Sequence, residues 1–233
     1  MTEARGQILA GIRRSLNRGR LDATRETALR QRVAAHRRNL VPARAATLDD
    51  PGRIDLFVAM AEEVQATVTR VDSPAAVPGE VARYLAAENL PAEVVLAPDS
   101  IVADLPWDER PLLRTRRGRA EAGDAVSMTP CFAAIAETGT LMLTSGAETP
   151  TTLNLLPDTH IVVVGMDQVV ASYEDGWDRL RTHGGMPRTI NFITGPSRTG
   201  DIEQRIELGA HGPRRLHIIL IDDRRNVGDG EGK

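Results

Sequence analysis

Residues 68–97 read VTRVDSPAAVPGEVARYLAAENLPAEVVLA and contain the pattern of a strand, a helix and a second strand. Val68–Val71 and Val94–Ala97 are rich in β-branched residues, which favour strands. Between them, Pro78 stands in the first turn of a helix that is predicted to end at Asn89. A strand–helix–strand unit is the usual connection in a parallel sheet. The stretch therefore predicts an α/β fold.

The rest of the chain repeats this alternation. Helices are predicted up to Ala66, at Tyr173–His183 and at Asp201–Leu208. Further strands are predicted at Ala125–Met128, Ala133–Ala136, Leu141–Thr144, Ile161–Gly165, Thr189–Thr194 and Leu216–Ile221. Several of these runs are apolar on both faces, which is typical of strands covered by helices on each side. We expect a mostly parallel open sheet, whose ligands bind outside the carboxyl ends of the strands.

Composition excludes several kinds of chemistry. The chain has 233 residues and one cysteine, Cys131, whereas an iron–sulfur cluster needs about four thiolates. The only lysine is Lys233, so a Schiff base or a lysine-dependent phosphate loop is not expected. No apolar run of about 18 residues and no secretory signal is visible. We therefore expect a cytoplasmic protein without a membrane span and without a cofactor of its own.

The distribution of charged residues distinguishes the first fifty residues from the rest of the chain. Residues 1–50 contain eleven arginines, five acids and no aromatic residue. Their apolar residues have helical spacing, which predicts a basic helical arm that packs on the body or on a second subunit. Nucleic-acid binding is the alternative, but no aromatic side chain is available to stack on bases. We predict an arm at 1–50, an α/β domain at 51–223 and a flexible polar tail at 224–233.

The first candidate site is the sequence Glu137-Thr138-Gly139-Thr140, between two apolar runs. Gly139 permits a turn that other residues disfavour, and the hydroxyls of Thr138 and Thr140 can orient a carboxylate. Glu137 is either a catalytic or binding group or the capping acid of a hairpin turn.

The second candidate is the loop Thr194–Thr199, which is expected to follow a strand and precede a helix. Backbone N–H groups from Gly195 onward, with Ser197, Arg198 and Thr199, would then form an anion site at the start of that helix.

The third candidate is His211, which the loop Gly209–Pro213 exposes. It is either a site acid, base or ligand, or a surface imidazole without a role. His160 and His217 lie within predicted strands, so we interpret them as structural. No pair of histidines has the spacing of a helical zinc site, and no metal site is expected.

Four motifs in one order resemble the LutC/YkgG family of lactate-utilisation proteins, the LUD domain. They are Glu137–Thr140, Thr152-Leu-Asn-Leu-Leu-Pro-Asp-Thr-His160, Ile193-Thr-Gly-Pro-Ser-Arg-Thr-Gly-Asp-Ile-Glu203 and Leu208-Gly-Ala-His-Gly-Pro-Arg-Arg-Leu-His217. The resemblance covers Asp55–Asp222. It implies a Rossmann-like sheet similar to the NagB/RpiA/CoA-transferase-like superfamily.

The resemblance also implies a role in oxidising L-lactate to pyruvate beside two iron–sulfur partners, LutA-like and LutB-like proteins. This chain would be the accessory subunit without redox centres, with Glu137, Arg198 and His211 in one cleft that binds a small carboxylate. The alternative is a free-standing CoA-transferase-like or sugar-phosphate-isomerase-like enzyme that uses Glu137 as nucleophile or base. Assembly into a homo-oligomer stays open.

Overall fold

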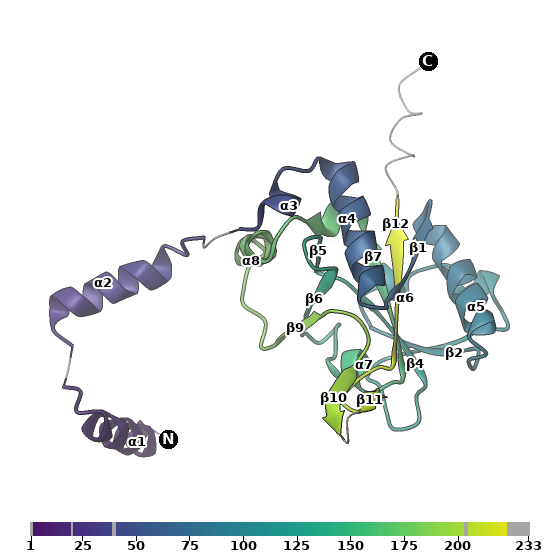
Figure 1. The fold of residues 1–233 in the computed structure, drawn as a ribbon. Helices are drawn as coiled ribbons and strands as arrows, with labels where there is room; N and C mark the ends of the chain where they lie inside the picture. Colours follow the sequence, from purple (N-terminus) through teal and green to yellow (C-terminus); the bar gives the residue numbers. More distant parts are fainter. Residues whose placement is uncertain (1, 20, 39–40, 203–204, 223–233) are drawn as a thin grey trace. The chain divides into compact units, whose positions relative to one another are not determined.

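The computed structural model describes residues 2–19, 21–38, 41–202 and 205–222, and the chain forms two compact units, Met1–Leu40 and Val41–Lys233. The first unit, which we call the arm, contains α1 (Thr2–Ser15) and α2 (Ala23–Ala34) (Figure 1). The Asp22 side chain begins α2 by accepting a hydrogen bond from the backbone N–H of Arg25. The predicted tail, 224–233, lies outside the described residues.

The second unit is built on a six-stranded parallel sheet. Its strands, in spatial order, are β1 (Thr67–Val71), β12 (Arg215–Ile221), β7 (Thr159–Gly165), β4 (Val126–Pro130), β2 (Glu93–Leu96) and β3 (Arg114–Arg117). In the register of the sheet, Thr67 pairs with His217, His217 with Ile161, and Ile161 with Met128. The predicted α/β class with a mostly parallel sheet is confirmed.

Each face of this sheet is covered. On one face, Val81 and Leu85 of α5 (Val77–Ala87) pack in one cluster with Ile161 and Ile219. On the other face, Phe57 of α4 (Asp50–Glu63) belongs to a second cluster. The central strands are therefore shielded on both sides, as their doubly apolar sequences indicate.

A second, four-stranded sheet shares the α4 side. It consists of β8 (Val169–Val170), β5 (Ala133–Ile135), β6 (Thr140–Thr144) and β9 (Ile190–Ile193), and its β5–β6 and β6–β9 pairs are antiparallel. Leu180 of α8 (Tyr173–Thr182) packs against this sheet. These strands were predicted as strands, but not as a separate sheet.

Short helices complete the unit: α3 (Ala43–Ala46), α6 (Ser100–Ala103), α7 (Thr152–Leu155), and the 3-10 turns Pro74–Ala76, Trp107–Glu109 and Met166–Gln168. Helix α3 attaches the chain to the second unit just after the arm. Ala45 is fully buried, and the Arg44 guanidinium donates to the backbone carbonyl of Glu137. Among the described residues, no helix combines the length and apolarity needed to cross a membrane.

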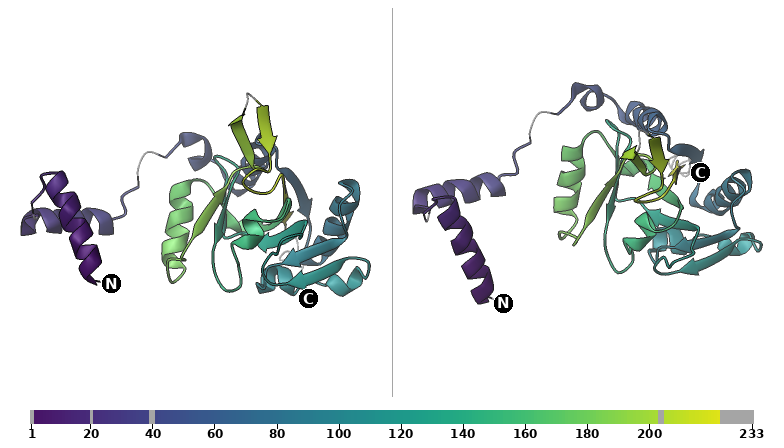
Figure 2. Two further views of the ribbon diagram at one scale, coloured as in Figure 1. Left: turned by 90° about the horizontal axis from the view of Figure 1, so that it is seen from below. Right: turned by 60° about the horizontal axis from the view of Figure 1, so that its bottom comes forward.

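The predicted helix at Asp201–Leu208 is wrong. The chain forms an antiparallel hairpin there, β10 (Arg198–Ile202) with β11 (Arg205–Leu208), which projects from the unit in Figure 2. Gly200 disfavours a helix, and the β-branched residues of this stretch favour extended backbone. The loop Thr194–Thr199 consequently leads into a strand. Anion binding there has no helix N-terminus to support it.

Candidate functional site

A cavity of about 500 Å³ lies beside the amino ends of β7 and β12, and we call it the amino-edge cavity. Its walls come from four parts of the chain: the end of α4 and residues within 154–160, 192–198 and 211–216. His160 and Leu216, the second residues of β7 and β12, fix its position. The general rule for open α/β sheets had directed attention to the opposite, carboxyl edge.

The loop at this cavity is fixed to the end of α4. Gly195 has φ +72°, and a Cβ there would lie 2.4 Å from the carbonyl oxygen of Val64. Arg198 donates from Nη2 to the same carbonyl at 3.3 Å. A guanidinium carries five N–H donors, and this is the bond that Arg198 makes within the part of the chain that the structure describes. Arg198 is exposed, so it is a cation at the mouth of the cavity.

The neighbouring loop brings His211 to the same place. The backbone N–H of Ser197 donates to the carbonyl of Pro213 at 2.8 Å, and that of Gly209 donates to the carbonyl of Ser197 at 3.0 Å. Ser197, Arg198 and His211 therefore line one cavity, together with Gly195. Of the predicted anion-binding loop, Thr199 is not among the lining residues.

His160 is a site residue that the sequence interpretation missed. It lines the amino-edge cavity with no exposed surface, and its Nε2 lies 2.8 Å from the Oγ1 of Thr129. Its Nδ1 is buried and has no hydrogen-bond partner among the described residues. Burial lowers the pKa of His160 to about 3, so the ring is neutral near pH 7. The unused nitrogen is the unsatisfied polar atom in this wall, where Asn154 is also buried.

The motif Thr152–His160 was the only sequence signal for this wall. This motif resembles the family, whereas the position of His160 within a predicted strand indicated a structural histidine. The signal was therefore present, but it did not assign the histidine to a site.

Glu137 lies elsewhere. Its side chain is 5% exposed and is not among the residues that line the amino-edge cavity. Oε1 accepts a hydrogen bond from the backbone N–H of Tyr173 at 3.2 Å, at the start of α8, and Oε2 has no partner among the described residues. A carboxylate in this place stabilises the N-terminus of a helix. Glu137 thus accepts a hydrogen bond from the first N–H of α8, whose N-cap residue is Ser172, and its catalytic role stays a prediction.

The rest of the Glu137–Thr140 turn packs on α4. Gly139 has φ +63°, and a Cβ there would lie 2.3 Å from the backbone nitrogen of Ala61. The Oγ1 of Thr140 lies 2.7 Å from the hydroxyls of both Thr138 and Thr194. Since Thr194 lines the amino-edge cavity, this chain of hydroxyls connects the turn to the cavity.

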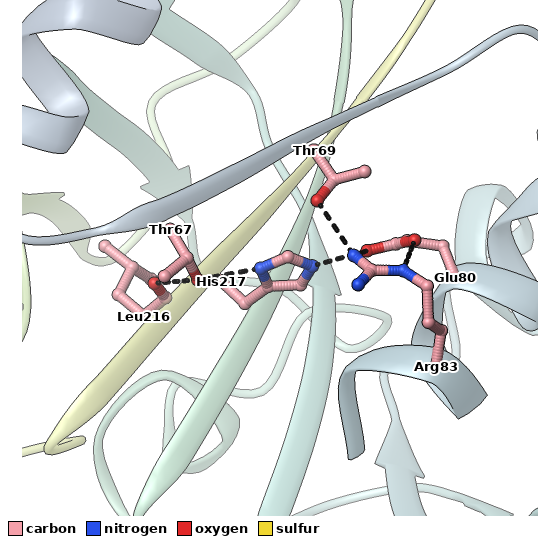
Figure 3. A network of polar contacts seen from close by, with 6 residues as sticks. All are labelled: Thr67, Thr69, Glu80, Arg83, Leu216 and His217. Atoms are coloured by element: carbon pink, nitrogen blue, oxygen red, sulfur yellow. Dashed lines mark hydrogen bonds and ion pairs between the residues drawn. The ribbon is translucent and has the colours of Figure 1, made fainter. Parts of the chain in front are cut away.

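His217 belongs to a separate network on the α5 face of the large sheet (Figure 3). Its Nδ1 lies 2.8 Å from the Oγ1 of Thr67, and Tyr84 stacks on its ring at 3.9 Å. Its Nε2 lies 3.4 Å from Glu80, whose carboxylate also forms a close ion pair with Arg83. Burial lowers the pKa of His217 to about 4. The network joins α5 to β1 and β12 and has a structural role.

A second cavity, of about 710 Å³, lies at the carboxyl ends of β2 and β4. Asp99, Cys131, Arg179 and His183 are among its lining residues, and none of the predicted site residues is. Burial raises the pKa of the Cys131 thiol to about 12, so this cysteine is not a reactive thiolate. We call this the carboxyl-edge cavity.

These features define an α/β protein whose motif segments meet at one end of a parallel sheet. The family model for the LUD domain matches residues 54–221, and the chain belongs to that family. The chain is 37% identical over 160 residues to a lactate utilization protein C from Deinococcus radiodurans, covering 64% of this chain and 70% of that protein.

Other matches are shorter or structural. A lactate utilization protein C from Bacillus subtilis is 36% identical over 94 residues, 39% of each protein, so that match spans well under two thirds of the relative. The crystal structure of a DUF162 family protein from Deinococcus radiodurans superposes with a TM-score of 0.58 at 30% identity, covering 75% of this chain and 99% of that one.

Proposed function

We propose that this chain acts in lactate utilisation as a non-redox protein that binds a small 2-hydroxy- or 2-oxo-carboxylate in the amino-edge cavity. One observation carries the proposal. Three of the four motifs that resemble the family contribute walls to this cavity, through residues such as His160, Arg198 and His211. The names of the relatives supply the class of metabolism.

The groups at the cavity suit such a ligand. The N–H groups of Arg198 that have no acceptor among the described residues can bind a carboxylate as a charge-assisted pair. The Nδ1 of His160 is a hydrogen-bonding atom that no described protein group uses, and the neutral ring donates or accepts there according to its tautomer. A hydroxyl group serves either tautomer, because it both donates and accepts, and since His160 has no exposed surface, the hydroxyl reaches Nδ1 only when the side chains of the wall move aside. His211, exposed at the rim, adds an imidazole that can hydrogen-bond the ligand.

In this proposal the electrons of lactate go to other proteins. A chain with one cysteine cannot ligate an iron–sulfur cluster alone, so we assign the clusters to two cytoplasmic partners that oxidise L-lactate to pyruvate. The alternative of acyl transfer by Glu137 gains no support from its position, because the carboxylate is buried at the start of α8.

Complementation tests the proposal. A strain that lacks its own copy of the gene should regain growth on L-lactate with the wild-type chain but not with Arg198→Gln. Arg119→Gln changes an exposed arginine that lines neither cavity and is the matched control, so it should restore growth. Normal growth with Arg198→Gln at a normal protein level would overturn the assignment of the site.

A further inference from the structure

The amino-edge cavity has an apolar wall that lactate alone does not explain. Leu155 and Phe192 line the cavity, and they are 49% and 37% exposed although both side chains are large and apolar. Exposed apolar side chains that gather at a hollow are typical of a binding site. The cavity of about 500 Å³ is within the range of about 300–1,000 Å³ for small-molecule sites. Lactate has only a methyl group beside its hydroxyl and carboxylate, so a ligand with a larger hydrocarbon group would fill the site better.

The ring of Phe192 is held in place by two other rings. Its centroid lies 5.4 Å from that of Tyr173 and 5.7 Å from that of Trp177, and both of these residues belong to α8. The chain has only seven aromatic residues, and three of them meet here. Tilted aromatic pairs at such distances attract each other beyond the area that they bury. The apolar wall is therefore formed before a ligand binds, which lowers the entropic cost of binding.

The apolar wall also lies close to the carboxylate site of the proposed function. A methyl group built on Gly212 would lie 4.0 Å from Cδ2 of Leu155 and 3.5 Å from Cβ of Ser197. Leu155 and the loop that carries Arg198 therefore lie on either side of one glycine. Glu63, an exposed acid, also lines the cavity, so a ligand with a second negative charge, such as a phosphate, would meet like charge. The cavity suits a singly charged carboxylate with an apolar group.

We propose that the amino-edge cavity binds 2-hydroxy acids with a branched aliphatic or aromatic side chain, and that Leu155 and Phe192 form the subsite for this side chain. The inference rests on the proposed function, because it requires the carboxylate of the ligand to bind at Arg198. Lactate is then the smallest ligand of the site. Each methylene group that becomes buried adds about fourfold in affinity, so the length of the side chain determines how tightly an acid binds.

Calorimetry with related acids tests the proposal. L-2-Hydroxy-4-methylpentanoate should bind the wild type about tenfold more tightly than L-lactate, or better. Leu155→Ala should reduce this ratio by about threefold or more. Leu156→Ala is the matched control, since Leu156 is 53% exposed and does not line the cavity, and it should keep the ratio. A ratio near one in the wild type, or a ratio unchanged by Leu155→Ala, would overturn the proposal. Equal binding of 4-methylpentanoate, which lacks the hydroxyl, would also contradict it.

The same titrations distinguish a failure of this proposal from a failure of the proposed function. If the proposed function is wrong, neither acid binds, or both bind Arg198→Gln as tightly as the wild type, and the subsite falls with it. If only the subsite is wrong, the two acids bind with equal affinity and both lose affinity in Arg198→Gln. Nuclear Overhauser effects locate the side chain of the ligand. The methyl protons of bound 2-hydroxy-4-methylpentanoate should contact the ring protons of Phe192, whereas contacts to Met186 would place the ligand in the carboxyl-edge cavity and refute the proposal.

Discussion

The two buried histidines should make the fold sensitive to mild acid. Burial lowers the pKa of His160 to about 3 and that of His217 to about 4, from an ordinary value of 6.5. As the pH falls below 6.5, His160 and His217 therefore each bind a proton in the unfolded chain before they do so in the folded chain. The histidines destabilise the fold progressively below that pH, and the full stability is present above it.

The magnitude follows from the pH interval. Each pH unit between the two pKa values changes the free energy of unfolding by about 1.4 kcal/mol per group. From pH 6.5 to pH 5 each histidine should therefore remove about 2 kcal/mol, and this loss requires only that the folded pKa lies well below 5. Burial pushes the pKa of Glu80 upward, but its hydrogen bond with Arg83 leaves that pKa below 4.5. Glu80 thus destabilises the fold only at still lower pH.

Urea unfolding at pH 7.5 and pH 5 measures the effect. The free energy of unfolding should be about 4 kcal/mol lower at pH 5, and His217→Gln should remove about half of that difference, whatever its effect on stability at pH 7.5. His183→Gln is the matched control, because His183 is exposed at the end of α8. Equal stability of the wild type at both pH values would refute the reasoning.

Three further predictions concern the turn and the site. Gly139→Ala should cost about 3 kcal/mol of stability in chemical denaturation, because its methyl group would meet the backbone of α4; Gly184→Ala, at φ +102° in open space, should cost less than half as much. Glu137→Ala should cost about 1 kcal/mol, since it removes the acceptor for the Tyr173 N–H, and an unchanged melting temperature would argue against a stabilising role of this hydrogen bond. Arg198→Gln should weaken calorimetric binding of L-lactate at least tenfold, and equal affinity would argue against its role as the carboxylate ligand.

The large sheet could be predicted from the sequence because each of its central strands has a local apolar pattern that indicates a buried strand. Ile161–Gly165 is a continuous apolar run and Leu216–Ile221 is apolar apart from His217, a pattern typical of strands that are buried on both faces in an α/β chain. The separate sheet could not be predicted in the same way. Ala133–Ile135 is also completely buried, so its local pattern does not indicate which sheet it joins.

The incorrect predictions near the site also arise where contacts between distant segments, and not the local sequence, determine the structure. The stretch 201–208 has apolar residues at Ile202 and Ile206, a spacing that fits a helix turn as well as a hairpin, and pairing across the hairpin decided the outcome. The role of His160 depends on which ring nitrogen finds a partner, and Thr129 comes from a different strand. Such pairings are tertiary and leave no local trace in the sequence.

We propose above that the ligand binds at the amino edge of the sheet. Titration of the ¹⁵N-labelled chain with L-lactate, followed by amide chemical shifts, tests it most directly. The largest shifts should occur at residues of the amino-edge cavity, such as Asn154, Ser197 and His211. Shifts centred on the carboxyl-edge cavity, at residues such as Ser145 and His183, or no shifts at saturating lactate, would contradict it.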